Sequence, residues 1–249
     1  MLVPVTVDGV AATFLFDTGT THLFVSADFG SRIGLSGKAR YLPVAIETAT
    51  PQPVYDAQFA PIESFKLGPI RARRNPGEVV ILDLSNVSLL AGEQIDGLLG
   101  NGLWASADYV LNVGEPSLQI VRTLDLFSDP QALPATVSDN RTYLPVAING
   151  KSFEFLLDTG SNFSTVSAEL FESLGEIDSE AVELGKVGIN AADTKSIKTF
   201  REFHAAVTLG QVSASDFVFL VDDKNVIGLD LLRLGELSVS VKQRRFVFR

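Results

Sequence analysis

Short apolar runs separated by turn residues recur along the whole chain. One run, residues 2–7, ends at Asp8-Gly9, and another, residues 143–148, ends at Asn149-Gly150. Asp-Gly and Asn-Gly between apolar runs are typical of two-residue hairpin turns, because these residue types tolerate a positive φ. The pattern therefore predicts two similar β-hairpins, one at the start of each half of the chain.

Each predicted hairpin leads into the same tripeptide, Asp-Thr-Gly. The return strands, residues 13–16 and 153–157, run into Asp17-Thr18-Gly19-Thr20 and Asp158-Thr159-Gly160-Ser161. The spacing between the two copies is constant at 141 residues, from 17 to 158 as from 4 to 145. A duplicated unit that preserves one acidic tripeptide indicates two carboxylates that meet across a pseudo-twofold axis.

Short helices are predicted after each tripeptide. They are expected at residues 27–33 and 168–174, the second with Ser167 at its start and Gly175 at its end. Between Leu67-Gly68 and Leu98-Leu99-Gly100 the first half also carries fourteen residues more than the second half does between the corresponding segments, and these are expected to form a short helix within residues 84–93.

The remaining pattern predicts a mainly β protein of two lobes. Each half is expected to close with strands in which apolar and polar residues alternate, at residues 109–121 and 237–248. Many short strands with closely spaced turns favour closed or sandwich-like β lobes over a parallel α/β sheet. The expected organisation is an N-terminal lobe at residues 1–122, a linker at 123–140 and a C-terminal lobe at 141–249.

Composition limits the class of partner. Acidic residues outnumber basic residues by 30 to 20, and the formal net charge is −10. Because no basic surplus is present to replace the counterions of a polyanion, the sequence argues against nucleic acid as a partner. A hydrophobic fraction of 46% supplies enough material for packed cores, yet no apolar run reaches the length of a membrane span.

Several kinds of catalytic site are excluded or disfavoured. The chain has no cysteine, so it contains no disulfide, thiolate nucleophile or cysteine metal site. His22 and His204, the only histidines, fall at unrelated places in the two halves, which argues against a serine triad or a zinc site. We expect no cofactor and no metal.

Paired aspartates carry a specific chemistry. Two carboxylates a few ångströms apart share one proton, so Asp17 and Asp158 are expected to act as one base and one acid. The charged member would activate a water for attack on a peptide carbonyl, while the protonated member would donate to the carbonyl oxygen.

The neighbours of the two aspartates have physical roles in this interpretation. Gly19 and Gly160 would allow a sharp turn and a close approach of backbone donors. Thr18 and Thr159 would hydrogen-bond across the pseudo-twofold axis. The side chains of Thr20 and Ser161 would donate to the outer carboxylate oxygens.

With these motifs, the chain resembles the pepsin-like and retropepsin-like aspartic proteases. The resemblance rests on an apolar pair before each Asp-Thr-Gly and on the later segments Leu98-Leu99-Gly100 and Val226-Ile227-Gly228. The lobes are more similar to the short retroviral type, as if a retropepsin dimer were fused into one chain. One departure is Gly102, which stands where the second half has Asp230.

The resemblance implies a bilobal fold of two pseudo-twofold-related, retropepsin-like β-barrel lobes with an active-site cleft between them. The aspartates would face each other at the base of this cleft, and each apolar-apolar-Gly strand would thread a ψ-shaped loop. A β-hairpin flap would cover the substrate, with residues 47–55 and 188–194 as candidates by position. Asp96, beside the first ψ segment, is expected to be a structural turn carboxylate, with a third catalytic acid as the alternative.

The sequence therefore predicts an aspartic endopeptidase, a hydrolase that acts on a peptide or protein substrate. The alternative is a catalytically silent peptide-binding protein with the same fold. A monomer is expected because both aspartates lie in one chain, with a dimer formed by exchange of lobes as the alternative. Localisation stays open: Met1, the only methionine, lies directly on the first strand, which favours a trimmed export signal and a periplasmic or secreted protein over an intact cytosolic one.

Overall fold

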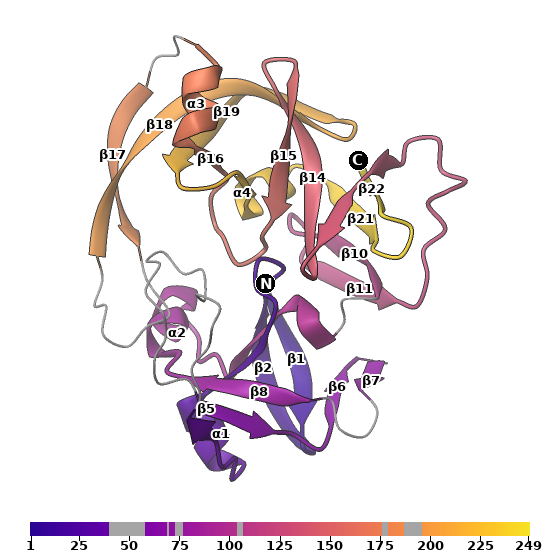
Figure 1. The fold of residues 1–249 in the computed structure, drawn as a ribbon, viewed down its shortest axis with the longest axis vertical. Helices are drawn as coiled ribbons and strands as arrows, with labels where there is room; N and C mark the ends of the chain where they lie inside the picture. Colours follow the sequence, from indigo (N-terminus) through magenta and orange to yellow (C-terminus); the bar gives the residue numbers. More distant parts are fainter. Residues whose placement is uncertain (40–57, 69, 73–76, 104–106, 176–178, 187–195) are drawn as a thin grey trace. The chain divides into compact units, whose positions relative to one another are not determined.

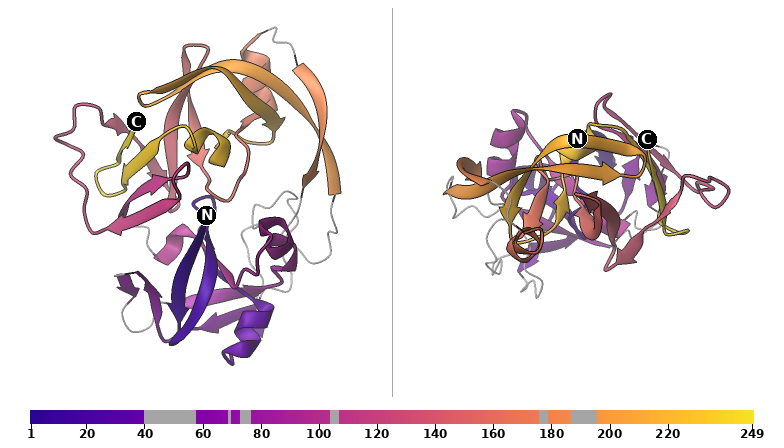
Figure 2. Two further views of the ribbon diagram at one scale, coloured as in Figure 1. Left: turned by 180° about the vertical axis from the view of Figure 1, so that it is seen from behind. Right: turned by 90° about the horizontal axis from the view of Figure 1, so that it is seen from above.

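The structure, a computed structural model, describes residues 1–39, 58–68, 70–72, 77–103, 107–175, 179–186 and 196–249. Two compact units are present. One comprises Met1–Leu103 with Leu184–Lys198, and the other comprises Trp104–Glu183 with Thr199–Arg249. Strands dominate both units in Figure 1 and in the two further views of Figure 2. The mainly β, two-lobed fold predicted from the sequence is confirmed.

A nine-stranded sheet forms the first unit. Its order is β4-β5-β8-β3-β9-β2-β1-β6-β7. The strands are β1 (Leu2–Val7), β2 (Val10–Phe16), β3 (Leu23–Ser26), β4 (Lys38–Ala39), β5 (Gln58–Pro61), β6 (Phe65–Leu67), β7 (Ile70–Ala72), β8 (Glu78–Leu82) and β9 (Gly97–Leu99).

The second large sheet has eight strands in the order β13-β14-β15-β20-β16-β19-β18-β17. The strands are β13 (Thr136–Ser138), β14 (Arg141–Ile148), β15 (Lys151–Leu157), β16 (Thr165–Ser167), β17 (Ser179–Lys186), β18 (Ser196–Leu209), β19 (Val212–Asp222) and β20 (Val226–Ile227). An additional antiparallel pairing of β14 with β18 closes this sheet on itself.

Both sheets contain the same ψ-shaped crossing. In the first, β9 runs parallel to β2 and antiparallel to β3, so it lies between the two strands that flank the first Asp-Thr-Gly. In the second, β20 runs parallel to β15 and antiparallel to β16. The internal repeat of the sequence is therefore a repeat of topology, as the family resemblance implied.

The two predicted hairpin turns are confirmed and carry a second role. Asp8 and Gly9 have φ values of 48° and 81°, and Asn149 and Gly150 have 48° and 80°. The Asp8 carboxylate accepts from Ser64 N at 2.7 Å, and the Asn149 side-chain oxygen accepts from Ala206 N at 3.0 Å. Each turn therefore also anchors a distant strand or its connection.

The predicted helices are present and short. They are α1 (Ala27–Arg32), α2 (Ser85–Ala91) and α3 (Ala168–Ser173). Two further elements are helix α4 (Leu229–Leu232) and the 3₁₀ turn η1 (Asn101–Leu103). Ser26 and Ser167 cap α1 and α3 by accepting a backbone N–H three residues on, at 3.1 Å in both cases. Helices of six residues are marginal alone, so burial of Phe29 and Phe171 against the sheets is needed to hold them.

The first sheet differs from the predicted barrel. Over the described residues it stays open, whereas the second sheet closes through β18, a single strand of 14 residues. The corresponding part of the first repeat is divided into β5, which ends at Pro61, and the short strand β6. In β18 the chain continues past the same place with only a register shift between Ala205 and Val207.

A third sheet joins strands from both halves of the sequence. Its order is β11-β10-β21-β22-β12, with β10 (Asp108–Asn112), β11 (Ser117–Val121), β12 (Leu133–Pro134), β21 (Glu236–Ser240) and β22 (Arg245–Phe248). The strands expected to close the first lobe therefore pair with those that close the second. The predicted linker also contains β12 and β13, which pair with β22 and β14. The boundaries at 122 and 140 stay predictions.

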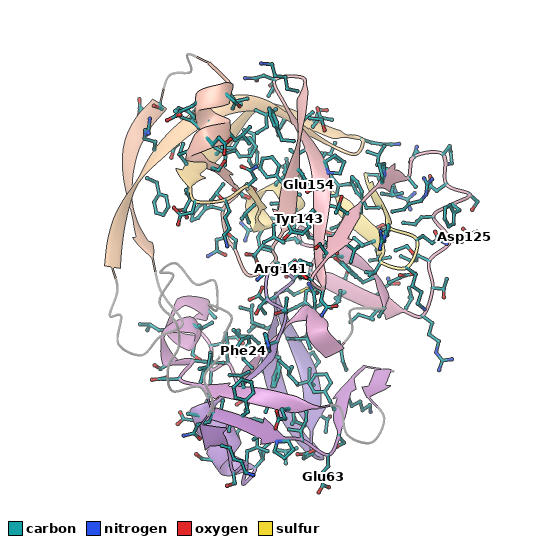
Figure 3. The ribbon with its side chains drawn as sticks, in the orientation of Figure 1. Phe24, Glu63, Asp125, Arg141, Tyr143 and Glu154 are labelled. Carbon is teal, nitrogen blue, oxygen red and sulfur yellow. The ribbon has the colours of Figure 1, made fainter. Side chains whose placement is uncertain are left out.

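Aromatic side chains fill the cores. In the first unit Phe14 makes edge contacts with Phe29 and Phe65 at centroid distances of 6.4 and 6.0 Å. In the second, Phe203 stacks on Phe219 at 5.6 Å. Phe24, labelled in Figure 3, is fully buried in the first unit. None of the helices found in the described ranges is long and apolar enough to cross a membrane.

A buried carboxylate fixes the third sheet. Asp108 on β10 is fully buried and accepts three hydrogen bonds, from Leu124 N at 2.7 Å, Ser240 Oγ at 3.0 Å and Val241 N at 2.9 Å. The last two donors lie where β21 ends. This one side chain therefore links β10 to the β21–β22 hairpin.

We expect Asp108→Ala to lower the free energy of unfolding by about 3 kcal/mol, because one buried and two partly buried donors lose their acceptor. The matched control is Asp125→Ala, which removes an exposed carboxylate on a loop of the same unit (Figure 3) and is expected to cost less than about 1 kcal/mol. Urea denaturation of both variants measures the difference. Equal costs would show that Asp108 is not a structural link.

Candidate active site

The Asp17 loop, defined as Asp17–Thr20, follows directly from β2. Asp17 N donates to Leu99 O of β9 at 3.1 Å. The carboxylate oxygen Oδ1 of Asp17 accepts from Gly19 N at 2.9 Å and from Thr20 N at 3.2 Å. Asp17 is half-buried, while Thr18 is buried. The loop therefore turns its backbone donors onto its own carboxylate.

The Asp158 loop, defined as Asp158–Ser161, repeats this arrangement after β15. Asp158 N donates to Ile227 O of β20 at 3.0 Å, and Oδ1 of Asp158 accepts from Gly160 N at 2.8 Å. Asp158 is half-buried and Thr159 is buried. In both loops the glycine N–H therefore donates to the aspartate carboxylate.

The strand of the ψ crossing holds each loop at both ends. Beyond the bond to the aspartate N–H, Asn101 N donates to Thr20 O at 2.9 Å, and Leu229 N donates to Ser161 O at 2.9 Å. These two bonds occupy the same place in the two repeats. The loops are therefore fixed to the sheets by backbone bonds that do not depend on side-chain identity.

Two glycines make this close attachment possible. A Cβ atom on Gly100 would lie 2.2 Å from His22 O, and one on Gly228 would lie 2.4 Å from the carbonyl carbon of Phe163. His22 and Phe163 occupy equivalent positions, five residues after each aspartate. Because the obstacles are backbone atoms, only glycine fits at these two positions.

The support of the two carboxylates by hydroxyl groups differs from the prediction. Ser161 Oγ donates to Phe163 O at 2.8 Å, so the expected donation to the Asp158 carboxylate is wrong in this structure. The loop bends its hydroxyl toward its own backbone instead, a local bond that serine commonly makes. At Thr20 it is the backbone N–H that reaches the Asp17 carboxylate. A bond between Thr18 and Thr159 stays a prediction.

Asn101 is a site residue that sequence reasoning missed. Its side-chain Nδ2 donates to Thr18 O at 2.7 Å, inside the Asp17 loop, and the residue is only 5% exposed. A polar amide directly after an apolar-apolar-Gly strand was the available signal, because such a side chain needs a buried partner.

Asp230 anchors the second repeat in a different way. Its carboxylate accepts from Ser164 Oγ at 2.6 Å, Ser164 N at 2.8 Å and Leu231 N at 2.7 Å. Burial raises the pKa of the Asp230 carboxyl, and these hydrogen bonds oppose the rise only in part. At the equivalent position the first repeat has Gly102.

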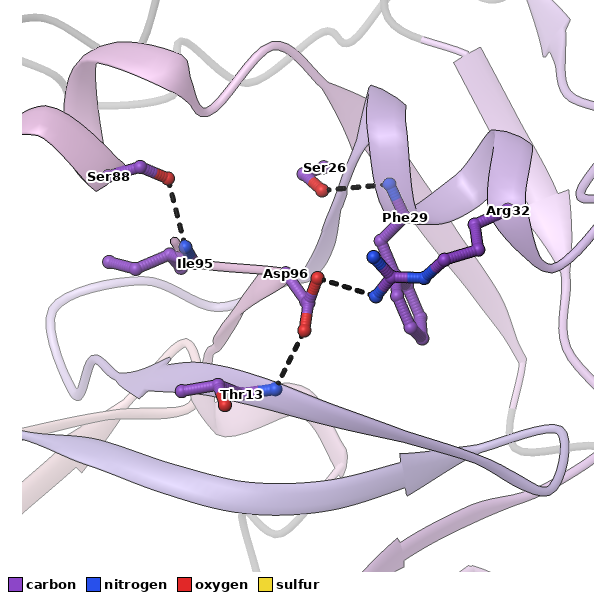
Figure 4. Close-up of polar contacts among 7 residues, drawn as sticks. All are labelled: Thr13, Ser26, Phe29, Arg32, Ser88, Ile95 and Asp96. Atoms are coloured by element: carbon purple, nitrogen blue, oxygen red, sulfur yellow. Dashed lines mark hydrogen bonds and ion pairs between the residues drawn. The ribbon is translucent and has the colours of Figure 1, made fainter. Parts of the chain in front are cut away.

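Asp96 is a structural carboxylate, as expected. Figure 4 shows it between the Arg32 guanidinium, at 2.8 Å, and Thr13 N, at 3.0 Å. Its backbone also accepts from Ser26 N at 2.8 Å. The residue therefore ties helix α1 and strand β2 to the start of β9, and this set of partners supports the fold, not acid catalysis.

The other candidates contribute less. His22 pairs with the Thr21 hydroxyl at 3.0 Å, and His204 pairs with Asp216 at 2.7 Å. Within the described ranges, His, Asp and Glu form no group of three that could hold a metal ion. The two flap candidates, residues 47–55 and 188–194, lie outside the described residues.

Comparison with known families agrees with the repeat seen in the structure. Residues 3–103 and 144–235, together more than half of the chain, match a family model described as aspartyl protease. Each match contains one Asp-Thr-Gly loop and one ψ crossing. No curated protein matches the chain at a significant level.

We expect Gly100→Ala to unfold the first unit or destabilise it by more than about 3 kcal/mol, because the new Cβ meets backbone atoms. Gly30→Ala in α1 is the matched control: its Cβ would have only ordinary contacts at 3.7 Å, and alanine favours the helix by up to about 1 kcal/mol. Thermal denaturation should show a lower Tm for G100A and an equal or higher Tm for G30A. A G100A protein as stable as the parent would contradict the close-approach argument.

The raised pKa of Asp230 predicts a pH-dependent cost. Below its ordinary value of 3.8 the carboxyl is protonated in both states, and the cost is absent. Because the folded state binds this proton more tightly than the unfolded chain, stability falls as pH rises from 3.8 through the raised folded-state pKa. Relative to Asp230→Asn, the parent should lose stability over this window. A difference between the two proteins that is independent of pH would refute the assignment.

Proposed function

The chain belongs to the aspartyl protease family, and from this premise we propose that it is an aspartic endopeptidase in which Asp17 and Asp158 form one catalytic pair. Its substrate is an extended peptide or protein segment. The reaction is hydrolysis of a peptide bond by a water molecule, without a covalent intermediate.

One observation carries the proposal. The two loops make the same set of backbone bonds: the aspartate N–H to the ψ strand, the glycine N–H to the carboxylate, and the strand's next N–H back to the loop. A lone Asp-Thr-Gly is an ordinary turn. Two loops held by the same three backbone bonds, each carrying a half-buried aspartate, are what a pseudo-symmetric pair of catalytic acids requires.

The chemistry follows from the sharing of one proton. When two carboxylates lie a few ångströms apart, their mutual repulsion keeps one protonated while the other is charged. The charged aspartate takes a proton from water, which attacks the peptide carbonyl carbon. The protonated aspartate donates to the carbonyl oxygen as the tetrahedral diol forms. The other aspartate then gives the proton that it took from water to the amine nitrogen as the C–N bond breaks, and a diol hydroxyl returns its proton, so that the pair again shares one proton.

The other residues of the two loops support the aspartates in different ways. Gly19 N–H and Gly160 N–H stabilise the charged forms of Asp17 and Asp158. Thr18 and Thr159 are both 1% exposed, and in this proposal their hydroxyl groups lock the two loops together. Because one chain carries both aspartates, a monomer would suffice for activity.

We expect Asp17→Asn and Asp158→Asn each to reduce kcat at least about a thousandfold with little loss of stability, since one amide leaves the pair without its shared proton. Asp8→Asn is the matched control, because the second repeat already has Asn149 at that position. The cleavage activity of the parent and the three variants is measured on a diverse peptide library between about pH 3 and 7.

Three outcomes are informative. Loss of cleavage in both loop variants but not in D8N supports the pair. Full activity in either loop variant refutes it. Binding of peptides by a folded parent that cleaves nothing at any pH would instead assign a silent peptide-binding protein.

A further inference from the structure

We propose that Asn101 is a positioning residue that strengthens the hydrogen bond between Gly19 N–H and the Asp17 carboxylate, and so makes Asp17 the charged member of the pair. This inference rests on the proposed function for its catalytic consequence. Its structural part concerns only the first repeat.

The geometry places Asn101 and Asp17 at opposite ends of one peptide group. The carbonyl oxygen of Thr18 accepts from Asn101 Nδ2 at 2.7 Å. The N–H of the same peptide group belongs to Gly19 and donates to Asp17 Oδ1 at 2.9 Å. Because the amide is conjugated, a donor on its oxygen makes its N–H a stronger donor.

Burial and orientation strengthen the effect. Asn101 is 5% exposed and Thr18 is 1% exposed, so the bond lies away from water, where hydrogen bonds polarise one another more strongly. Only the NH₂ end of the Asn101 side chain can donate to a carbonyl, which fixes its orientation. The backbone of Asn101 is held as well, through its N–H to Thr20 O at 2.9 Å.

The second repeat has no equivalent side chain. Leu229 takes the place of Asn101, with the same backbone bond to the loop, and leucine has no side-chain donor. The polar residue of that segment, Asp230, contacts Ser164 and not the Asp158 loop. The two loops share the bonds to the ψ segment and the glycine N–H bond to the carboxylate. They differ at the fourth loop residue, where Thr20 N donates to the Asp17 carboxylate at 3.2 Å and Ser161 N to the backbone oxygen of Asp158 at 3.3 Å. They also differ in the side-chain donor Asn101, which the first repeat has where the second has Leu229.

This difference breaks the symmetry of the pair. A carboxylate that accepts a stronger hydrogen bond is favoured in its charged form. Asp17 would then hold the negative charge and act as the base toward water, and Asp158 would hold the proton and act as the acid toward the carbonyl oxygen.

Asn101→Leu tests the inference, since it gives the first repeat the residue of the second. In the pH profile of kcat/KM, we expect the acidic limb to move up by about half a pH unit, and the maximum to fall about tenfold, because the Asp17 carboxylate is less stabilised. In an NMR spectrum, the Gly19 amide proton should move upfield while that of Gly160 stays in place.

Asn225→Leu is the matched control. Asn225 also uses its side-chain amide beside a ψ strand, with Ser167 N donating to its oxygen at 2.8 Å, but it does not contact an Asp-Thr-Gly loop. We expect it to lower stability without moving the acidic limb. If N101L does not fold, Asn101→Ala removes the same donor with less bulk.

The outcomes separate the two proposals. An unchanged acidic limb and an unchanged Gly19 resonance in folded N101L would overturn the role of Asn101 while cleavage by the parent stands. A parent that cleaves nothing would overturn the proposed function. In that case the NMR comparison decides whether Asn101 polarises the Gly19 amide: an upfield shift of Gly19 alone supports it, and no shift refutes it.

Discussion

The fold depends on the passage of one strand behind each Asp-Thr-Gly loop. Strand β9 lies between β2 and β3, and β20 lies between β15 and β16, and each accepts the aspartate N–H on a carbonyl of its second apolar residue. The strand continues past the loop only because Gly100 and Gly228 present no side chain to the backbone they cross. This single constraint explains why the apolar-apolar-Gly motif and the Asp-Thr-Gly motif occur together in each repeat.

Around this crossing, the two repeats reach the same result with different side chains. The first uses Arg32 and Asp96 to tie helix α1 to the ψ strand, and Asn101 to hold the loop. The second uses Asp230 on Ser164. Backbone bonds define the shared architecture, while the side chains that support the two loops differ.

Much of this was predictable from local patterns. Asp8-Gly9 and Asn149-Gly150 fix hairpin turns, and Ser167 and Gly175 bound a helix, because each acts over a few residues. Features that depend on long-range contacts were not predicted from the sequence. The open first sheet and the pairing of β10 with β21 depend on contacts between distant strands, which periodicity does not encode. The sequence predicts that the Ser161 hydroxyl donates to the Asp158 carboxylate, but it donates to the backbone oxygen of Phe163 instead. Asn101 was missed since its partner, Thr18 O, is 83 residues away.

In the proposed mechanism, Asp17 and Asp158 act together on one water molecule. A crystal structure of the chain with a peptide mimic that carries a hydroxyl group in place of the scissile carbonyl tests it most directly. In such a structure this hydroxyl should lie within about 3 Å of a carboxylate oxygen of both aspartates. A mimic whose hydroxyl contacts one aspartate alone, or that binds away from both loops, would contradict it.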